Sequence, residues 1–296
     1  MNSRLVLGTV QLGMPYGINN KVGKPSFDNA VKIIKTAFDN GINRFDTSQA
    51  YGESEEVLGR SFQELGIKSD VRVYTKLDPK LNLCDRAAVR KSVEDSLLKL
   101  KVNQLECIMI HHEEGMDYWD KGLGVILKEL ITEGKTKSLG ASFYTPKKVL
   151  EILDVEGVNV FQIPSNILDS RFENFGVFEK AEKLGKDILI RSIFLQGLLL
   201  MEPEKVPKTL KAVIPYIEKF RKISAEMNMS HKELAFCCAA SMWPNAYIVF
   251  GVETPEQVIE NIKYSKNVIS NDVCKKIFRE FSNIDEKLLN PVFWIK

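Results

Sequence analysis

The sequence predicts a (β/α)8 barrel with a C-terminal extension. Strands and helices alternate strictly along the chain, and the strands are rich in Val, Ile and Leu, which is typical of a parallel sheet covered by helices. Eight such strand–helix pairs indicate a closed barrel, and a chain of 296 residues can hold a barrel of about 250 residues and more. We therefore expect residues 1–296 to form a single domain.

The expected elements are read in order along the chain. Strands are predicted at 4–8, 42–45, 71–76, 105–110, 138–142, 159–163, 187–192 and 246–250. Helices are predicted at 27–40, 53–65, 85–100, 118–132, 146–153, 175–184, 230–241 and 255–264. The tail 271–296 exceeds what the barrel needs, and its apolar end 291–295 is expected to pack on the barrel or on a partner.

Several helices carry recognisable end signals. Ser26 is the expected N-cap of the first helix, and Gly41 lies just past its end. Ser230 and Thr254 are each followed three residues later by Glu or Gln, as in a capping box, and a proline follows Thr254 at the first helical position. In the helix 85–100 the apolar residues recur at helical spacing.

Composition excludes several classes of protein. A net charge of +2 with both signs interspersed provides no basic face for nucleic acid or membrane, and no apolar run approaches the roughly 18 residues of a membrane span. Five cysteines at irregular spacings and the absence of a signal peptide predict a reducing, cytoplasmic location. Three histidines without a ligand cluster predict no metal site. We expect a monomer or weak homo-oligomer.

Ionisable side chains stand at the ends of three consecutive strands. The strand 42–45 ends on Asp46, the next ends on Lys76 and the third is followed by His111. Tyr51 lies in the loop after the first of them. Ligands bind at the carboxyl edge of a parallel α/β sheet, so these four side chains are candidates for one active site. Asp46 and Lys76 alone could also be a structural ion pair.

These four residues, in this order, resemble the catalytic tetrad of the aldo-keto reductases. The surrounding segments match as well: Gly-Thr at 8–9, Asn-Arg-Phe-Asp-Thr at 43–47, Tyr-Gly-x-Ser-Glu at 51–55 and Glu-Gly-Lys-Thr-Lys-Ser-Leu-Gly at 133–140. The resemblance extends from about residue 5 to about residue 261. It implies NAD(P)H-dependent reduction of an aldehyde or ketone to an alcohol by hydride transfer.

The resemblance assigns Tyr51 as the proton donor. A free tyrosine has a pKa of about 10, and the ammonium of Lys76 is expected to bring that pKa closer to neutrality. Asp46 supplies the charge that a buried lysine needs, and His111 is expected to be neutral and to orient the substrate oxygen.

The resemblance also implies a nicotinamide dinucleotide bound across the strand ends. Its expected contacts are Gly8, Thr9, Ser142, Gln162, Arg191, Ser192, Gly197, Gly251, Gln257, Glu260 and Asn261. The family pattern favours NADPH. However, Gly251, Val252 and Gln257 replace the residues that usually hold its adenosine phosphate, which leaves NADH open. The helix N-terminus at 254–257 is expected to offer backbone N–H groups to an anion.

Two residues depart from the pattern near the nicotinamide. Phe143 replaces an asparagine, which puts one amide contact in doubt, and Arg191 replaces a tyrosine that stacks on the ring. A guanidinium can also stack on a ring, and it would repel oxidised nicotinamide more than the reduced form. We therefore hypothesise that Arg191 favours the reduced cofactor. In the alternative, Arg191 points outward into an ion pair.

The substrate is expected to be polar. Gln11, Tyr16, His112 and Gln196 are candidates to line its pocket, which favours a polar, sugar-like aldehyde or ketone. His112 replaces a frequent tryptophan and either binds the substrate or only fills space. Two other functions are considered: a nicotinamide-binding sensor with little turnover, and a barrel lyase or isomerase acting on phosphosugars.

Overall fold

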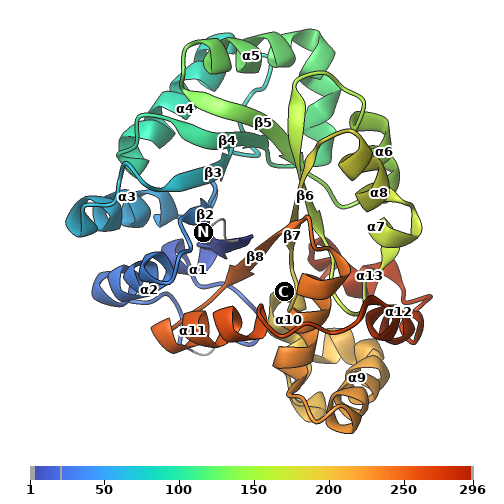
Figure 1. The fold of residues 1–296 in the computed structure, drawn as a ribbon. Helices are drawn as coiled ribbons and strands as arrows, with labels where there is room; N and C mark the ends of the chain where they lie inside the picture. The colour runs from blue at the N-terminus through green and yellow to red at the C-terminus, as the bar shows by residue number, and fades with distance from the viewer. Residues whose placement is uncertain (1–3, 21, 295–296) are drawn as a thin grey trace.

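The computed structural model describes residues 4–20 and 22–294, and it confirms the predicted (β/α)8 barrel. Eight parallel strands pair in chain order, and β8 closes the barrel against β1 (Figure 1). The strands are β1 (Leu5–Gly8), β2 (Arg44–Asp46), β3 (Arg72–Lys76), β4 (Leu105–Ile110), β5 (Thr136–Ser142), β6 (Val158–Pro164), β7 (Asp187–Arg191) and β8 (Tyr247–Gly251). Because all strands run in one direction, their carboxyl ends meet at one rim.

Helices surround the strands on the outside (Figure 1). Those of the repeating units are α2 (Phe27–Asp39), α3 (Ser54–Leu65), α4 (Arg86–Leu100), α5 (Gly124–Thr132), α6 (Pro146–Ile152), α8 (Val177–Lys183), α10 (His231–Met242) and α11 (Pro255–Tyr264). The predicted caps are present, because the hydroxyls of Ser26, Ser230 and Thr254 accept the backbone N–H groups of Asn29, Glu233 and Gln257.

Shorter elements interrupt this pattern. They are α1 (Val10–Gly13), the helical turns η1 (Glu113–Tyr118), η2 (Trp119–Leu123), η3 (Leu195–Leu200), η4 (Pro203–Lys205) and η5 (Lys208–Val213), and the helices α7 (Arg171–Asn174) and α9 (Ile214–Glu226). The regular helix predicted from Tyr118 was therefore placed too early. Gly122, at φ 112°, breaks the chain direction there, and α5 begins only at Gly124.

Two apolar layers stabilise the barrel. Mostly aliphatic and sulfur-containing side chains fill its interior together with one tyrosine, namely Val6, Tyr74, Cys107, Met109, Val160, Leu189 and Val249. A larger layer lies between the strands and the surrounding helices, and Phe45, Phe161 and Phe236 are fully buried in it. Cys107, Cys237 and Cys238 are also buried. The interior layer closes the barrel below its rim, so a ligand has access only from the strand ends.

The C-terminal extension packs on the barrel only in part. It contains α12 (Asn271–Arg279), α13 (Glu286–Leu289) and the turn η6 (Pro291–Phe293). Leu289 and Trp294 are buried against the main core, whereas Val292 and Phe293 are 63% and 54% exposed. Residue 295 lies outside the described residues. Across the described part of the chain, no helix combines the length and apolar character that crossing a membrane requires.

Candidate active site

The carboxyl ends of the strands surround a cavity of about 400 Å³. Asp46 and Lys76 are the last residues of β2 and β3, and His111 directly follows β4. Tyr51 lies in the turn between β2 and α3. The four side chains predicted from the strand ends thus line one cavity, which has the size of an ordinary small-molecule site.

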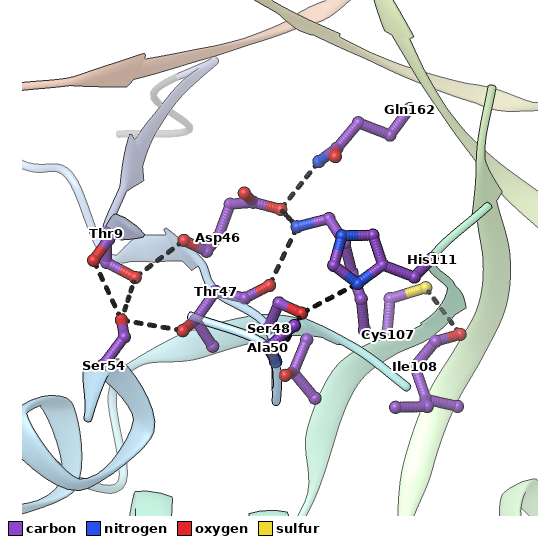
Figure 2. Close-up of polar contacts among 12 residues, drawn as sticks. Thr9, Asp46, Thr47, Ser48, Ala50, Ser54, Cys107, Ile108, His111 and Gln162 are labelled. Atoms are coloured by element: carbon purple, nitrogen blue, oxygen red, sulfur yellow. Dashed lines mark hydrogen bonds and ion pairs between the residues drawn. The ribbon is translucent and has the colours of Figure 1, made fainter. Parts of the chain in front are cut away.

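A buried ion pair forms the floor of this cavity. Lys76 Nζ donates to Asp46 Oδ1 at 2.7 Å and to the Thr47 carbonyl at 2.8 Å, and the Lys76 side chain is only 1% exposed. Gln162 Nε2 also donates to Asp46 Oδ1, at 2.7 Å (Figure 2). Burial lowers the pKa of Lys76, and the Asp46 carboxylate opposes that shift. The pair is therefore fixed in position by hydrogen bonds on both partners.

Buried hydroxyls hold the turn that carries Tyr51. Ser54, the first residue of α3, donates to the Thr9 carbonyl at 2.9 Å and accepts from Thr47 at 2.9 Å (Figure 2). Gly13 lets α1 approach this turn, because a Cβ there would lie 1.8 Å from the Tyr51 carbonyl oxygen. These contacts tie β1, β2 and α3 together, so the position of Tyr51 is set by the fold.

The Tyr51 hydroxyl is free to act on a ligand. Lys76 Nζ lies 5.0 Å from the centre of the Tyr51 ring, and the His111 ring packs edge-on against it at 5.9 Å. Within residues 4–20 and 22–294, the hydroxyl itself forms no hydrogen bond. Burial raises the pKa of Tyr51, and Asp46 adds to that shift. The prediction that this pKa is brought closer to neutrality is therefore wrong for the described structure, because burial and the Asp46 carboxylate raise it.

His111 is neutral, and Ser48 determines which ring nitrogen carries its proton. Burial, followed by the charge of Lys76, lowers the pKa of His111 to about 3. Ser48 Oγ lies 3.1 Å from His111 Nδ1 and accepts the Ala50 N–H at 3.1 Å (Figure 2). Ser48 is fully buried, and in the described structure its hydroxyl proton has only Nδ1 as an acceptor. With Ser48 as the donor to Nδ1, the ring proton lies on Nε2.

Arg191 lines the cavity and does not point outward. Its guanidinium lies 4.3 Å from the centre of the Tyr144 ring and donates to the Phe143 carbonyl and to Ser192 Oγ, both at 3.3 Å. Among the described residues it has no carboxylate partner, so the alternative of an outward ion pair is wrong. Phe143 packs in the core against Phe161, at 5.5 Å between ring centres. Arg191 thus places an unneutralised positive charge in the cavity.

The loop after β7 is strained where it faces the cavity. Ser192, Leu195 and Gln196 adopt left-handed φ values of 62°, 48° and 53°, which non-glycine residues rarely adopt. Gln196 and Gly197 line the cavity, and the Gln196 carbonyl accepts the Ile18 N–H at 3.1 Å. Strain of this kind is typical of ligand-binding loops. The contact also joins the loop after β7 to the loop after β1.

The other predicted ligand contacts line the cavity, with one exception. Gly8, Thr9, Ser142, Gln162, Ser192, Gly251, Gln257 and Asn261, together with Tyr16 and His112, all face it. Glu260 does not; it binds Lys232 and Tyr264 instead. Gln11 lies against Gly251, where a Cβ would be 2.3 Å from its Nε2. Gln11, predicted as a substrate contact, thus lines the cavity beside Gly251, a predicted cofactor contact.

Part of the backbone expected to bind an anion is already engaged or lacks an N–H. Gln257 Oε1 accepts the Glu253 N–H at 2.8 Å, and Thr254 Oγ1 accepts the Gln257 N–H at 3.4 Å. Pro255 has no N–H. Of the residues 254–257 predicted to offer N–H groups to an anion, Gln257 therefore has its N–H occupied by a side chain and Pro255 has none.

Several lining residues were not predicted from the sequence. They are mostly polar or charged and include Asn19, Asn20, Tyr144, Lys232 and Glu253. Tyr144 and Glu253 lie close to residues that were predicted, two positions after Ser142 and Gly251. Lys232 comes from the start of α10, and no strand-end signal could have indicated it.

Unpaired polar atoms in the cavity wall fit a large polar ligand. Gln162 Oε1 and both amide atoms of Asn261 are buried without a hydrogen-bond partner in the described structure, and both residues are at most 1% exposed. Buried polar atoms are nearly always hydrogen-bonded, so these atoms indicate groups that a ligand supplies. A nicotinamide bound at Gln162 and an adenine bound at Asn261 would supply the missing hydrogen-bond partners.

Fold and site together define a barrel enzyme of the oxidoreductase class. A sequence model of the Aldo/keto reductase family matches residues 4–279. Because this match covers nearly the whole chain, the protein belongs to the Aldo/keto reductase family, whose members are NAD(P)H-dependent oxidoreductases.

Individual relatives agree with this assignment. The NADH-specific methylglyoxal reductase of Escherichia coli (strain K12) is 24% identical over 325 residues, covering 96% of each chain. Aldo-keto reductase YhdN of Bacillus subtilis (strain 168) is 29% identical over 181 residues, covering 58% of this chain and 52% of the relative. The structure of a glycerol dehydrogenase from Gluconobacter oxydans superposes with a TM-score of 0.74 at 25% identity, covering 96% of this chain and 94% of the other.

The contact between Ser48 and His111 yields a first prediction. Replacing Ser48 with alanine is expected to shift the His111 proton partly to Nδ1 and to lower turnover about tenfold, the value of one good hydrogen bond. Nitrogen NMR shifts of the ring report the tautomer directly. Ser61→Ala is the control, because that buried hydroxyl bonds only to the Val57 carbonyl. A wild-type ring already protonated on Nδ1 would contradict the prediction.

Proposed function

We propose that this protein reduces a small polar aldehyde or ketone to an alcohol, with Tyr51 as the proton donor. The observation that carries the proposal is the half-buried Tyr51, whose hydroxyl is free within the described residues, beside a neutral His111 in a cavity with unpaired amide atoms on Gln162 and Asn261. Relatives named for methylglyoxal and glycerol act on small polar molecules, which supports this class of substrate.

The chain's own residues account for the proton. A nicotinamide cofactor, when bound, supplies the hydride that goes to the carbonyl carbon. His111 Nε2–H donates a hydrogen bond to the carbonyl oxygen and orients it toward Tyr51. As negative charge develops on that oxygen, the Tyr51 hydroxyl transfers its proton and the alcohol forms. Solvent then returns a proton to the phenolate. A tyrosine whose pKa is raised keeps its proton until an alkoxide requires it.

The remaining lining residues suit a hydrated substrate. Tyr16, His112 and Gln196 face the cavity with polar atoms, and Asn19 and Asn20 add further amides. The His112 ring stacks on His111 at 4.8 Å between ring centres. A sugar-like aldehyde would find hydrogen-bond partners on several sides, whereas a steroid would leave them unpaired.

A direct assay tests the proposal. Purified protein is titrated with NADPH and NADH by fluorescence, and oxidation of the bound cofactor is then followed with a panel of hydroxyaldehydes and hydroxyketones. Oxidation by some of them is expected. Binding without turnover on any carbonyl would favour the sensor function, and no binding of either cofactor would contradict the proposal.

Arg191 supports a second prediction, on the redox form of the cofactor. Because the guanidinium has no carboxylate partner among the described residues, it should disfavour the positive ring of oxidised nicotinamide. We expect NADH to bind about tenfold more tightly than NAD+. Arg191→Tyr should narrow this ratio, and Arg191→Lys, which keeps the charge, should largely preserve it. Affinities from titration calorimetry provide the measurement. The same ratio in wild type and Arg191→Tyr would contradict the prediction.

A further inference from the structure

The cavity wall after β8 carries a net negative charge. Lys232, the second residue of α10, lines this part of the cavity and is ion-paired with Glu260 on α11. Tyr264 Oη donates to the same carboxylate at 2.7 Å. Glu253 also lines the cavity, and within the described residues its carboxylate has no ion-pair or hydrogen-bond partner. One ammonium, that of Lys232, therefore balances only one of two carboxylates, those of Glu260 and Glu253.

The same wall has few donors left for an anion. Gln257 Oε1 accepts the Glu253 N–H, and Thr254 Oγ1 accepts the Gln257 N–H. Pro255 has no N–H to offer. A helix N-terminus binds a phosphate through such free N–H groups. Because side chains accept the Glu253 and Gln257 N–H groups and Pro255 has none, the start of α11 offers a phosphate fewer N–H groups than a helix start usually does.

Asn261 indicates which part of a dinucleotide lies near this wall. Its side-chain nitrogen and oxygen are both buried without partners, and the residue is 1% exposed. An amide that offers one donor and one acceptor matches the N6 and N7 edge of adenine. Gln257 and Glu253 lie at the start of the same helix and face the same cavity. The ribose joined to that adenine would therefore lie close to them.

We propose that this wall selects NADH over NADPH through Glu253, on the basis of the proposed function, which makes a nicotinamide dinucleotide the ligand. The two cofactors differ only at the adenosine ribose, where NADPH carries a phosphate of about −1.5 to −2 charge near neutral pH. That phosphate would meet the Glu253 carboxylate without a free cation to balance it. In NADH the ribose hydroxyl can instead donate a hydrogen bond to the carboxylate.

Binding measurements without substrate test the proposal. Dissociation constants for NADH and NADPH are determined by fluorescence titration on the full chain, for wild type and Glu253→Gln. Wild type is expected to bind NADH at least about tenfold more tightly, and Glu253→Gln to narrow the ratio by strengthening NADPH. Glu256→Gln is the matched control, since it removes the same charge from an exposed residue that does not line the cavity.

Each other outcome has a defined meaning. Tighter binding of NADPH by wild type, lost in Lys232→Met, would overturn the proposal and show that Lys232 leaves Glu260 to hold the phosphate. Equal effects of Glu253→Gln and Glu256→Gln would overturn it by showing that only overall charge matters. If neither cofactor binds to wild type, the proposed function itself fails, and this inference fails with it.

Discussion

Replacing Tyr51 with phenylalanine is expected to lower the rate of carbonyl reduction by about two to four orders of magnitude, the usual contribution of a positioned acid. The variant removes only the hydroxyl, which forms no hydrogen bond within the described residues. The ring remains, with its packing against His111 at 5.9 Å and its position 5.0 Å from Lys76 Nζ. Stability and cofactor affinity should therefore be nearly unchanged.

The measurement separates chemistry from binding. Steady-state kcat and KM are determined together with the cofactor dissociation constant, and kcat should fall while the dissociation constant stays constant. Tyr216→Phe, on α9 and outside the cavity lining, is the control. A Tyr51→Phe variant that keeps most of its kcat would mean that another group donates the proton.

The barrel and its catalytic rim could be predicted because the relevant signals are local. A strand of alternating or continuous apolar residues ends on a charged residue, as at Asp46 and Lys76, and parallel strands bring such ends to one rim. Caps at Ser26, Ser230 and Thr254 depend on neighbouring residues and were also correct. In these cases the local sequence was sufficient to predict the structure.

Features that depend on contacts between distant segments were not predictable in this way. Lys232 reaches the cavity from a helix, after a long connection that contains α9 and several short turns. The direction of the Tyr51 pKa shift was misjudged because it depends on how deeply the phenol is buried and on the nearby Asp46 carboxylate. At the helix start expected to bind an anion, the Gln257 N–H is likewise taken by the Thr254 side chain. The charged residues could be counted from the sequence, but which of them pair in the fold could not be predicted from it.

The buried pair of Lys76 and Asp46 gives the largest expected effect on stability. Lys76→Met leaves the Asp46 carboxylate buried, with Gln162 as its remaining side-chain donor at 2.7 Å. Removing one partner of a buried ion pair costs about 3–5 kcal/mol in free energy of unfolding. Urea unfolding near neutral pH measures this cost. Lys91→Met is the control, because its pair with Asp95 is exposed and worth at most about 0.5 kcal/mol.

A double variant tells whether the pair itself stabilises the fold. Burial lowers the pKa of Lys76 despite the attraction of Asp46, which indicates that desolvation of the ammonium outweighs the gain from pairing. Combining Lys76→Met with Asp46→Asn removes both charges, so the double variant should recover much of the stability that Lys76→Met loses. A double variant that is no more stable than Lys76→Met would instead mean that the pair is a net source of stability. If recovery is observed while turnover stays low, the pair is retained for the chemistry at Tyr51 and His111 and not for the fold.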